Sequence, residues 1–158
     1  MVKLTPLIVV VLLVSFESRG RADEVAARGI LKQWLQDAAT HTDAPPDSTA
    51  TPFEYHTLGV KKHCEGTFNE PKALMAWWKC FRKAEDYLLT DFQNGGELEL
   101  PSARVPMPKS LKTMAKRIRM PGTWAEGVFV GDGMTSRFLF LTTERGQVAA
   151  LLVDVTFF

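Results

Sequence analysis

Two long segments of the chain carry apolar residues at helical spacing. In residues 23–39 one side of a helical wheel is formed by Ala27, Leu31, Trp34, Leu35 and Ala38. In residues 70–92 a second stripe is formed by Leu74, Trp77, Trp78, Phe81, Ala84, Leu88 and Phe92. Asn69 is a suitable N-cap for this second segment, and the glycine pair 95–96 is a suitable stop. The pattern predicts two amphipathic helices, each with one buried face.

Three apolar runs extend from Trp124 to the last residue and are separated by turn residues at 131–133 and 145–146. Apolar runs of this length with glycine-containing turns between them are typical of antiparallel strands. We therefore predict a three-stranded meander that ends near the C-terminus.

The last hairpin allows two registers. If residues 145–146 form a two-residue turn, Arg137 lies opposite Asp154. A three-residue loop with Gly146 in the left-handed conformation would instead place Arg137 opposite Val153. Charge pairing favours the first register.

The remaining segments have weaker patterns. Residues 40–52 hold three prolines among small polar residues, and we expect a surface linker there. Short extended segments are expected at 53–58 and 97–100, and a short amphipathic helix at 109–119.

This order of elements predicts an α+β domain. We expect the long helix and the N-terminal helix to pack on one face of a curved antiparallel sheet that ends in the C-terminal meander. The layout is similar to cone-like folds of the cystatin or nuclear-transport-factor kind, by topology alone and without shared motifs. Such folds host many functions, so the analogy assigns none.

The first 22 residues have the features of a secretory signal peptide. Lys3 gives a positive start, residues 7–14 are uninterrupted apolar residues, and Gly20 and Ala22 place small residues at the two positions that a signal peptidase reads. The apolar run is shorter than the roughly 20 residues that a membrane-spanning helix needs. We expect cleavage after residue 22, one soluble domain over residues 23–158, and a location in the periplasm or outside the cell. An uncleaved, anchored form is the alternative.

Charge argues against one class of partner. Residues 1–22 hold three of the 19 basic and one of the 18 acidic side chains, so the remainder has a net charge of about −1. A nearly neutral domain lacks the bulk attraction that nucleic-acid binding requires. We expect no nucleic-acid partner.

Cys64 and Cys80 are the two cysteines of the chain. In an exported protein they are expected to form a disulfide, which would stabilise the fold by roughly 3 kcal/mol through the loop that it closes. Two buried thiols are the alternative. His63 precedes Cys64, but the chain has no CxxC or HxxxH spacing to complete a metal site. We expect neither a metal nor a cofactor.

Asp154 is the one candidate catalytic residue, and a weak one. It is the single acid within the long apolar C-terminal run, where a carboxylate facing a cavity would have a raised pKa and act as a general base, with His56 as a second member of the site. The competing interpretation is an ion pair with Arg137. An adjacent His63–Cys64 catalytic pair is disfavoured because Cys64 is expected to be oxidised.

A basic cluster lies in the predicted short helix. Its members are Lys109, Lys112, Lys116, Arg117 and Arg119. Such a cluster either binds an anionic membrane surface, a phosphate or an acidic partner, or is the solvated face of the helix.

We expect a non-enzymatic exported domain that binds a small apolar ligand or a partner protein on the concave side of its sheet. The candidate ligand-binding residues are Leu139, Leu152, Asp154 and Phe158, on the sheet face that the two long helices leave uncovered. The alternatives are a small hydrolase or isomerase that uses Asp154, and attachment to an anionic surface through residues 109–119.

Overall fold

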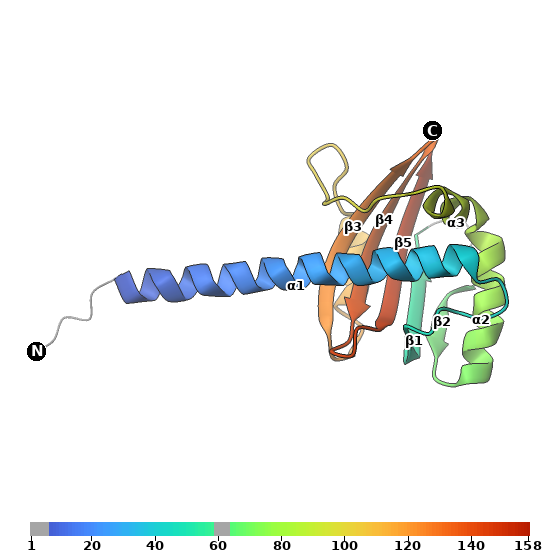
Figure 1. Cartoon of the computed structure of the whole chain (residues 1–158), viewed down its shortest axis with the longest axis horizontal. Coiled ribbons are helices and arrows are strands. Elements are labelled where there is room, and N and C mark those ends of the chain that lie inside the picture. The colour runs from blue at the N-terminus through green and yellow to red at the C-terminus, as the bar shows by residue number, and fades with distance from the viewer. Residues whose placement is uncertain (1–6, 59–63) are drawn as a thin grey trace, which may run out of the picture.

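The computed structural model describes residues 7–58 and 64–158, with side chains from Asp23 onward. The helices are α1 (Leu7–Thr40), α2 (Pro71–Ala84), α3 (Asp86–Gln93) and α4 (Lys109–Ala115). The strands are β1 (Thr49–Thr57), β2 (Gly66–Phe68), β3 (Thr123–Gly131), β4 (Met134–Thr142) and β5 (Val148–Phe157). Together they form the predicted α+β fold (Figure 1).

The five strands form one open sheet in the order β2-β1-β5-β4-β3. The meander β3-β4-β5 is antiparallel, as the turn residues predicted. β1 pairs in parallel with β5, so the sheet is mixed rather than wholly antiparallel. β2 joins β1 as an antiparallel edge strand.

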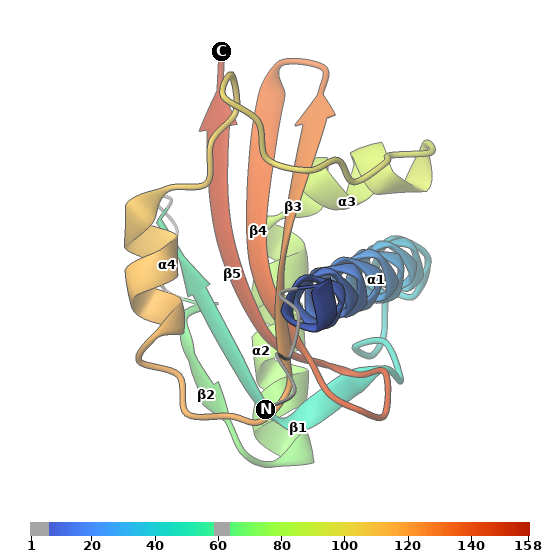
Figure 2. The same cartoon turned by 90° about the vertical axis from the view of Figure 1, so that its left-hand side faces the viewer.

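The sheet has a helical layer on each face (Figure 2). Helices α1, α2 and α3 cover the first face, where the predicted helix stripes pack against alternate residues of the strands. Helix α4 covers the second face, where Leu111 packs with Leu139 and Leu152. Two apolar cores are therefore separated by the sheet.

The predicted N-terminal stripe is confirmed, since all five of its apolar residues are buried in the first core. Helix α1 begins well before residue 23, and its N-terminal part projects past the sheet (Figure 1). In the part of the chain that the structure describes, no helix combines the length and apolarity needed to cross a membrane.

The long helix predicted over residues 70–92 is interrupted at Glu85, which separates α2 from α3. Its predicted stripe nevertheless packs in the first core along both helices, and Ala84 is its one partly buried member. Glu85 accepts a hydrogen bond from the hydroxyl of Tyr55 at 3.3 Å. Burial first, and then the Glu85 carboxylate, hold the pKa of Tyr55 well above its usual value, so the phenol stays a donor. This tertiary contact is made at the point where the helix breaks.

Two predicted boundaries are wrong. The linker predicted over residues 40–52 ends at Ser48, because Thr49 and Ala50 are buried and belong to β1. Thr49 pairs with Val148 and accepts a 2.8 Å hydrogen bond from the indole of Trp34. The strand predicted at 97–100 is reduced to one bridge between Glu99 and Val128.

Cys64 and Cys80 form the predicted disulfide, with 5.7 Å between their Cα atoms. Cys80 lies on α2, and Cys64 precedes β2, which leads the chain back to the start of that helix. The disulfide therefore attaches the β2 edge of the sheet to the helical layer on the first face.

Candidate functional site

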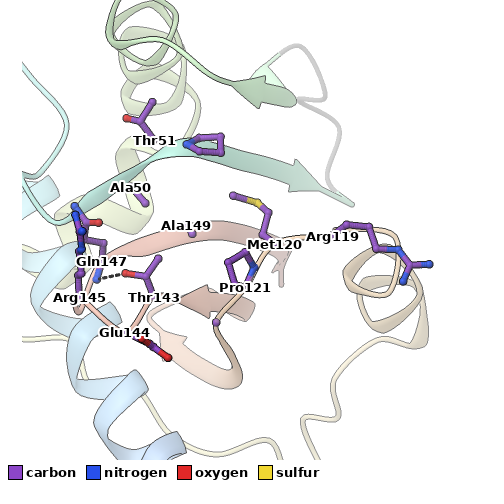
Figure 3. A pocket seen from close by; sticks show the side chains of 12 residues that line it. Ala50, Thr51, Arg119, Met120, Pro121, Thr143, Glu144, Arg145, Gln147 and Ala149 are labelled. Carbon is purple, nitrogen blue, oxygen red and sulfur yellow. Dashed lines mark hydrogen bonds between the residues drawn. The ribbon is translucent and has the colours of Figure 1, made fainter.

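A cleft opens on the second face, between the start of β1, the loop after α4 and the β4–β5 hairpin (Figure 3). We call it the β5 cleft. It has a volume of about 570 Å³ and is lined by Ala50, Thr51, Pro52, Arg119, Met120, Pro121, Gly122, Thr143, Glu144, Arg145, Gln147 and Ala149. The three segments are far apart in sequence and meet only in the folded domain.

The cleft lies where β5 loses register with both neighbouring strands. Along β1, the pairing passes from Thr49–Val148 to Glu54–Ala150, so β1 advances by five residues while β5 advances by two. Along β4, the register shifts at Ala149. Extra residues bend a strand and open the ladder, and such bulges occur preferentially beside functional sites.

The hairpin explains the bulge at Ala149. Thr143 and Gln147 close a three-residue loop with Gly146 at φ +72°, which is the left-handed turn considered above as the alternative. The bulge then shifts the pairing by one residue, and Arg137 lies opposite Asp154 as the favoured register predicted. The pairing prediction is confirmed, whereas the two-residue turn assumed for it is wrong.

The floor of the cleft is made of small apolar side chains. Ala50 and Ala149 are 6% and 2% exposed. One wall is formed by the loop of Met120 and Pro121, which Gly122 brings against the end of β4. A Cβ atom at Gly122 would collide with the carbonyl oxygen of Thr142, and its φ of +146° is one that glycine adopts readily. The sequence therefore permits this close approach.

The rim of the cleft is polar. Thr143, Arg145 and Gln147 come from the hairpin, and the hydroxyl oxygen of Thr143 accepts a 3.2 Å hydrogen bond from the backbone amide of Gln147. Figure 3 shows the side chains of Arg145 and Gln147 next to each other at one end of the cleft, with Glu144 directed away from it. Arg119 stands at the opposite end with its guanidinium directed outward.

The weak catalytic candidate has the ion-pair partner that the register predicted. Oδ2 of Asp154 accepts a hydrogen bond from Nη1 of Arg137 at 3.1 Å, and the same nitrogen lies 3.2 Å from Oγ1 of Thr156. Asp154 does not line the β5 cleft or the pockets beside Lys112 and beside Gln33. These contacts are those of a structural ion pair.

The other candidate ligand-binding residues lie apart from the cleft. Leu139 and Leu152 are directly paired across β4 and β5 and are buried under Leu111 of α4. Phe158 is 81% exposed, at the far end of the sheet. Helix α4 thus provides the cover that the apolar second face requires.

The basic cluster is partly neutralised. Lys112 forms an ion pair with Glu126 on β3, with 3.3 Å between Nζ and Oε1. Lys109, Lys116 and Arg117 are exposed on α4 and the turn that follows it. Arg119 is the member of the cluster that lines the β5 cleft.

Histidines and metal ligands give no further site in the described residues. His56 forms a 3.2 Å contact with Glu54 on its own strand, and His41 lies at the end of α1, whereas His63 lies outside the described residues. No group of three potential His, Cys, Asp or Glu ligands occurs in the described part of the chain.

Sequence patterns did not reveal the β5 cleft. Its lining comes from the predicted linker, a hairpin loop and the residues after the basic helix. The glycine and proline residues around 121–122 and 146 were the available signal, but they indicated turns and gave no information about proximity.

Comparisons of the chain with protein-family models, with curated proteins and with solved structures found no match.

Proposed function

We propose that the domain is an exported, non-enzymatic binding module that holds a small, largely apolar molecule in the β5 cleft. The main observation behind the proposal is that the sheet opens at Ala149, where the register of β5 shifts against both β1 and β4. The resulting volume of about 570 Å³ falls in the range of about 300–1,000 Å³ that is usual for small-molecule sites.

The composition of the lining supports binding over catalysis. The described residues that line the cleft include no histidine, cysteine, serine, aspartate or lysine. These side chains supply most nucleophiles and general bases in enzymes. Glu144 is the one lining carboxylate, and it is exposed and directed away from the cleft (Figure 3).

The shape of the site favours a small molecule over a partner protein. A stable protein interface buries about 800 Å² on each partner, usually with a central aromatic or arginine anchor in a pocket. The β5 cleft is instead a concave site with an alanine floor and a methionine and proline wall. Such a surface matches an alkyl chain or a ring system.

Export is part of the proposal. The Cys64–Cys80 disulfide is compatible with an oxidising compartment. The leader pattern of residues 1–22 supports the same location.

The binding proposal is tested by titrating the ¹⁵N-labelled protein with 1-octanol and with 2-naphthalenemethanol, which offer a flexible and a rigid apolar body. We expect saturable amide shifts centred on Gly122, Thr143 and Ala149. Titrations without saturable shifts at these amides, or with shifts confined to another surface, would contradict the proposal.

Two variants test whether the changes in amide chemical shift come from binding in the β5 cleft. Ala149→Leu fills the floor, and Met120→Ala removes one wall, so each is expected to weaken binding about tenfold or more, the equivalent of about 1.4 kcal/mol. As a control, Met114→Ala makes the same methionine-to-alanine change on α4, outside the cleft, and is expected to leave binding unchanged. Thermal melts show whether each variant is folded. Equal losses in Met120→Ala and Met114→Ala would exclude a specific role for the cleft.

A further inference from the structure

We infer that the molecule held in the β5 cleft carries a carboxylate, which is bound by the hairpin residues Thr143, Arg145 and Gln147. This inference depends on the binding function proposed above and specifies the chemistry of the ligand. It is supported by the position of three hydrogen-bond donors at one end of a cleft whose floor and one wall are apolar.

The three donors come from alternate positions of one short loop. The loop is closed by hydrogen bonds between Thr143 and Gln147, which fix the two residues at its base. Because the Thr143 oxygen already accepts the amide of Gln147, the hydroxyl hydrogen is free to be donated to a ligand. The side-chain amide of Gln147 supplies a second kind of donor next to Arg145 (Figure 3).

Arg145 has no ion-pair partner among the described residues, and the same is true of Arg119 at the other end of the cleft. Three other arginines of the domain are engaged: Arg28 with Glu24, Arg82 with two carbonyls at and just after the end of α1, and Arg137 with Asp154. An unpaired cation beside an apolar floor attracts a ligand with one anionic end.

The local charge supports an anion over a cation. The lining holds Arg119 and Arg145 against Glu144. Lys116 and Arg117 are exposed a few residues before Arg119, so they add to the positive charge of the segment that leads to the cleft. An amine would meet this charge unfavourably, whereas an alcohol would be indifferent to it.

Carboxylate is the favoured anion because Arg145 is the one cation among the three donors and neutralises the single charge of a carboxylate, whereas a phosphate carries up to two charges. The guanidinium group presents a planar fork of donors that matches the two oxygens of a carboxylate. The amide and hydroxyl donors beside Arg145 can bind the same two oxygens from the side. The apolar body of the ligand would then lie over Ala149 and against Met120.

The test compares two matched pairs of probes, octanoate with 1-octanol and 2-naphthoate with 2-naphthalenemethanol, at low ionic strength. We expect each carboxylate to bind about three- to tenfold more tightly than its alcohol, the range for a partly exposed, hydrogen-bonded ion pair. The preference should diminish as salt is added.

Arg145→Gln should remove the preference and leave the affinity for the alcohols unchanged. Arg104→Gln makes the same change at an exposed arginine outside the cleft and should retain the preference. Arg119→Gln should have a smaller effect than Arg145→Gln, because its guanidinium points outward (Figure 3).

The outcomes separate the two proposals. Equal affinities for carboxylates and alcohols at the cleft, or equal losses of preference in Arg145→Gln and Arg104→Gln, would overturn the carboxylate inference and leave the binding function standing. An absence of any cleft binding by all four probes would overturn both.

Discussion

The two faces of the sheet are closed in different ways. On the first face, three helices and a cluster of aromatic rings fill the space above the strands; the rings belong to Trp34, Phe53, Tyr55, Phe68, Trp77, Trp78 and Phe81. On the second face, one seven-residue helix and small side chains leave the β5 cleft open. Large rings therefore provide rigidity on one side, and alanines leave room for a ligand on the other.

The largest expected effect comes from the centre of the aromatic cluster. Trp34 is fully buried and lies with its ring centroid 6.2 Å from that of Trp78 and 5.8 Å from that of Phe81. Trp34→Ala is expected to lower the free energy of unfolding by about 3–5 kcal/mol, because it leaves a cavity and removes the hydrogen bond to Thr49. Urea unfolding followed by circular dichroism measures the change.

Trp124 provides the matched substitution on the second face, where its side chain is half-buried beside α4. Trp124→Ala is expected to cost about 1 kcal/mol. If the two tryptophan variants lost equal stability, the proposed division between a rigid and an open face would be wrong.

The disulfide is the next largest contribution to the first face. Replacing both Cys64 and Cys80 with serine is expected to lower the free energy of unfolding by about 3 kcal/mol, since the unfolded chain is no longer constrained. In denaturant unfolding, the free energy of unfolding of the variant should equal that of the wild-type protein measured under reducing conditions. Binding at the β5 cleft, on the opposite face, should be retained, and its loss would show that the two faces are coupled.

Arg82 joins two helices of the first face. Its Nη1 donates to the carbonyl oxygens of Ala38 at 2.6 Å and His41 at 2.8 Å, and its guanidinium lies 5.7 Å from the ring centroid of Trp78. These carbonyls are at the C-terminal end of α1, where a cation satisfies unpaired acceptors and complements the helix dipole.

We expect Arg82→Met to lower the free energy of unfolding by about 1–2 kcal/mol. Lys83→Met, at the exposed neighbouring position, should have little effect. Thermal and urea unfolding of the pair provide the measurement, and similar stabilities of the two variants would contradict the assigned role of Arg82.

Periodicity predicted the first face well. The helix stripes are set by local sequence, and each predicted apolar position of α1 is buried. Periodicity could not indicate the break at Glu85, because the apolar stripe continues past this residue to Leu88 and Phe92. The contact of Glu85 with Tyr55 connects residues 30 positions apart, which no local pattern records.

The second face was less predictable because small shifts of register determine it. A two-residue turn and a three-residue loop followed by a bulge give the same partners beyond Ala149. Charge pairing of Arg137 with Asp154 therefore identified the register but could not reveal the bulge. The parallel pairing of β1 with β5 was also missed, since the start of β1 has the prolines and small residues of a linker.

The smallest expected change in stability concerns the N-terminal part of α1, before the helix joins the core of the first face. Residues 23–26 of α1 are exposed, and Ala27 is the first described residue of the helix that joins the core. Removal of residues 1–22 is therefore expected to change the free energy of unfolding by less than about 0.5 kcal/mol, the usual limit for surface changes. Asp23 and Glu24 would then occupy the first helical turn, where negative charge is favourable.

Removal of residues 1–31 provides the contrast, because it takes Ala27 and Leu31 from the core. Melting temperatures of the two truncated proteins and the full chain measure the difference; a large loss on removing residues 1–22 alone would show that the projecting part of α1 belongs to the folded domain.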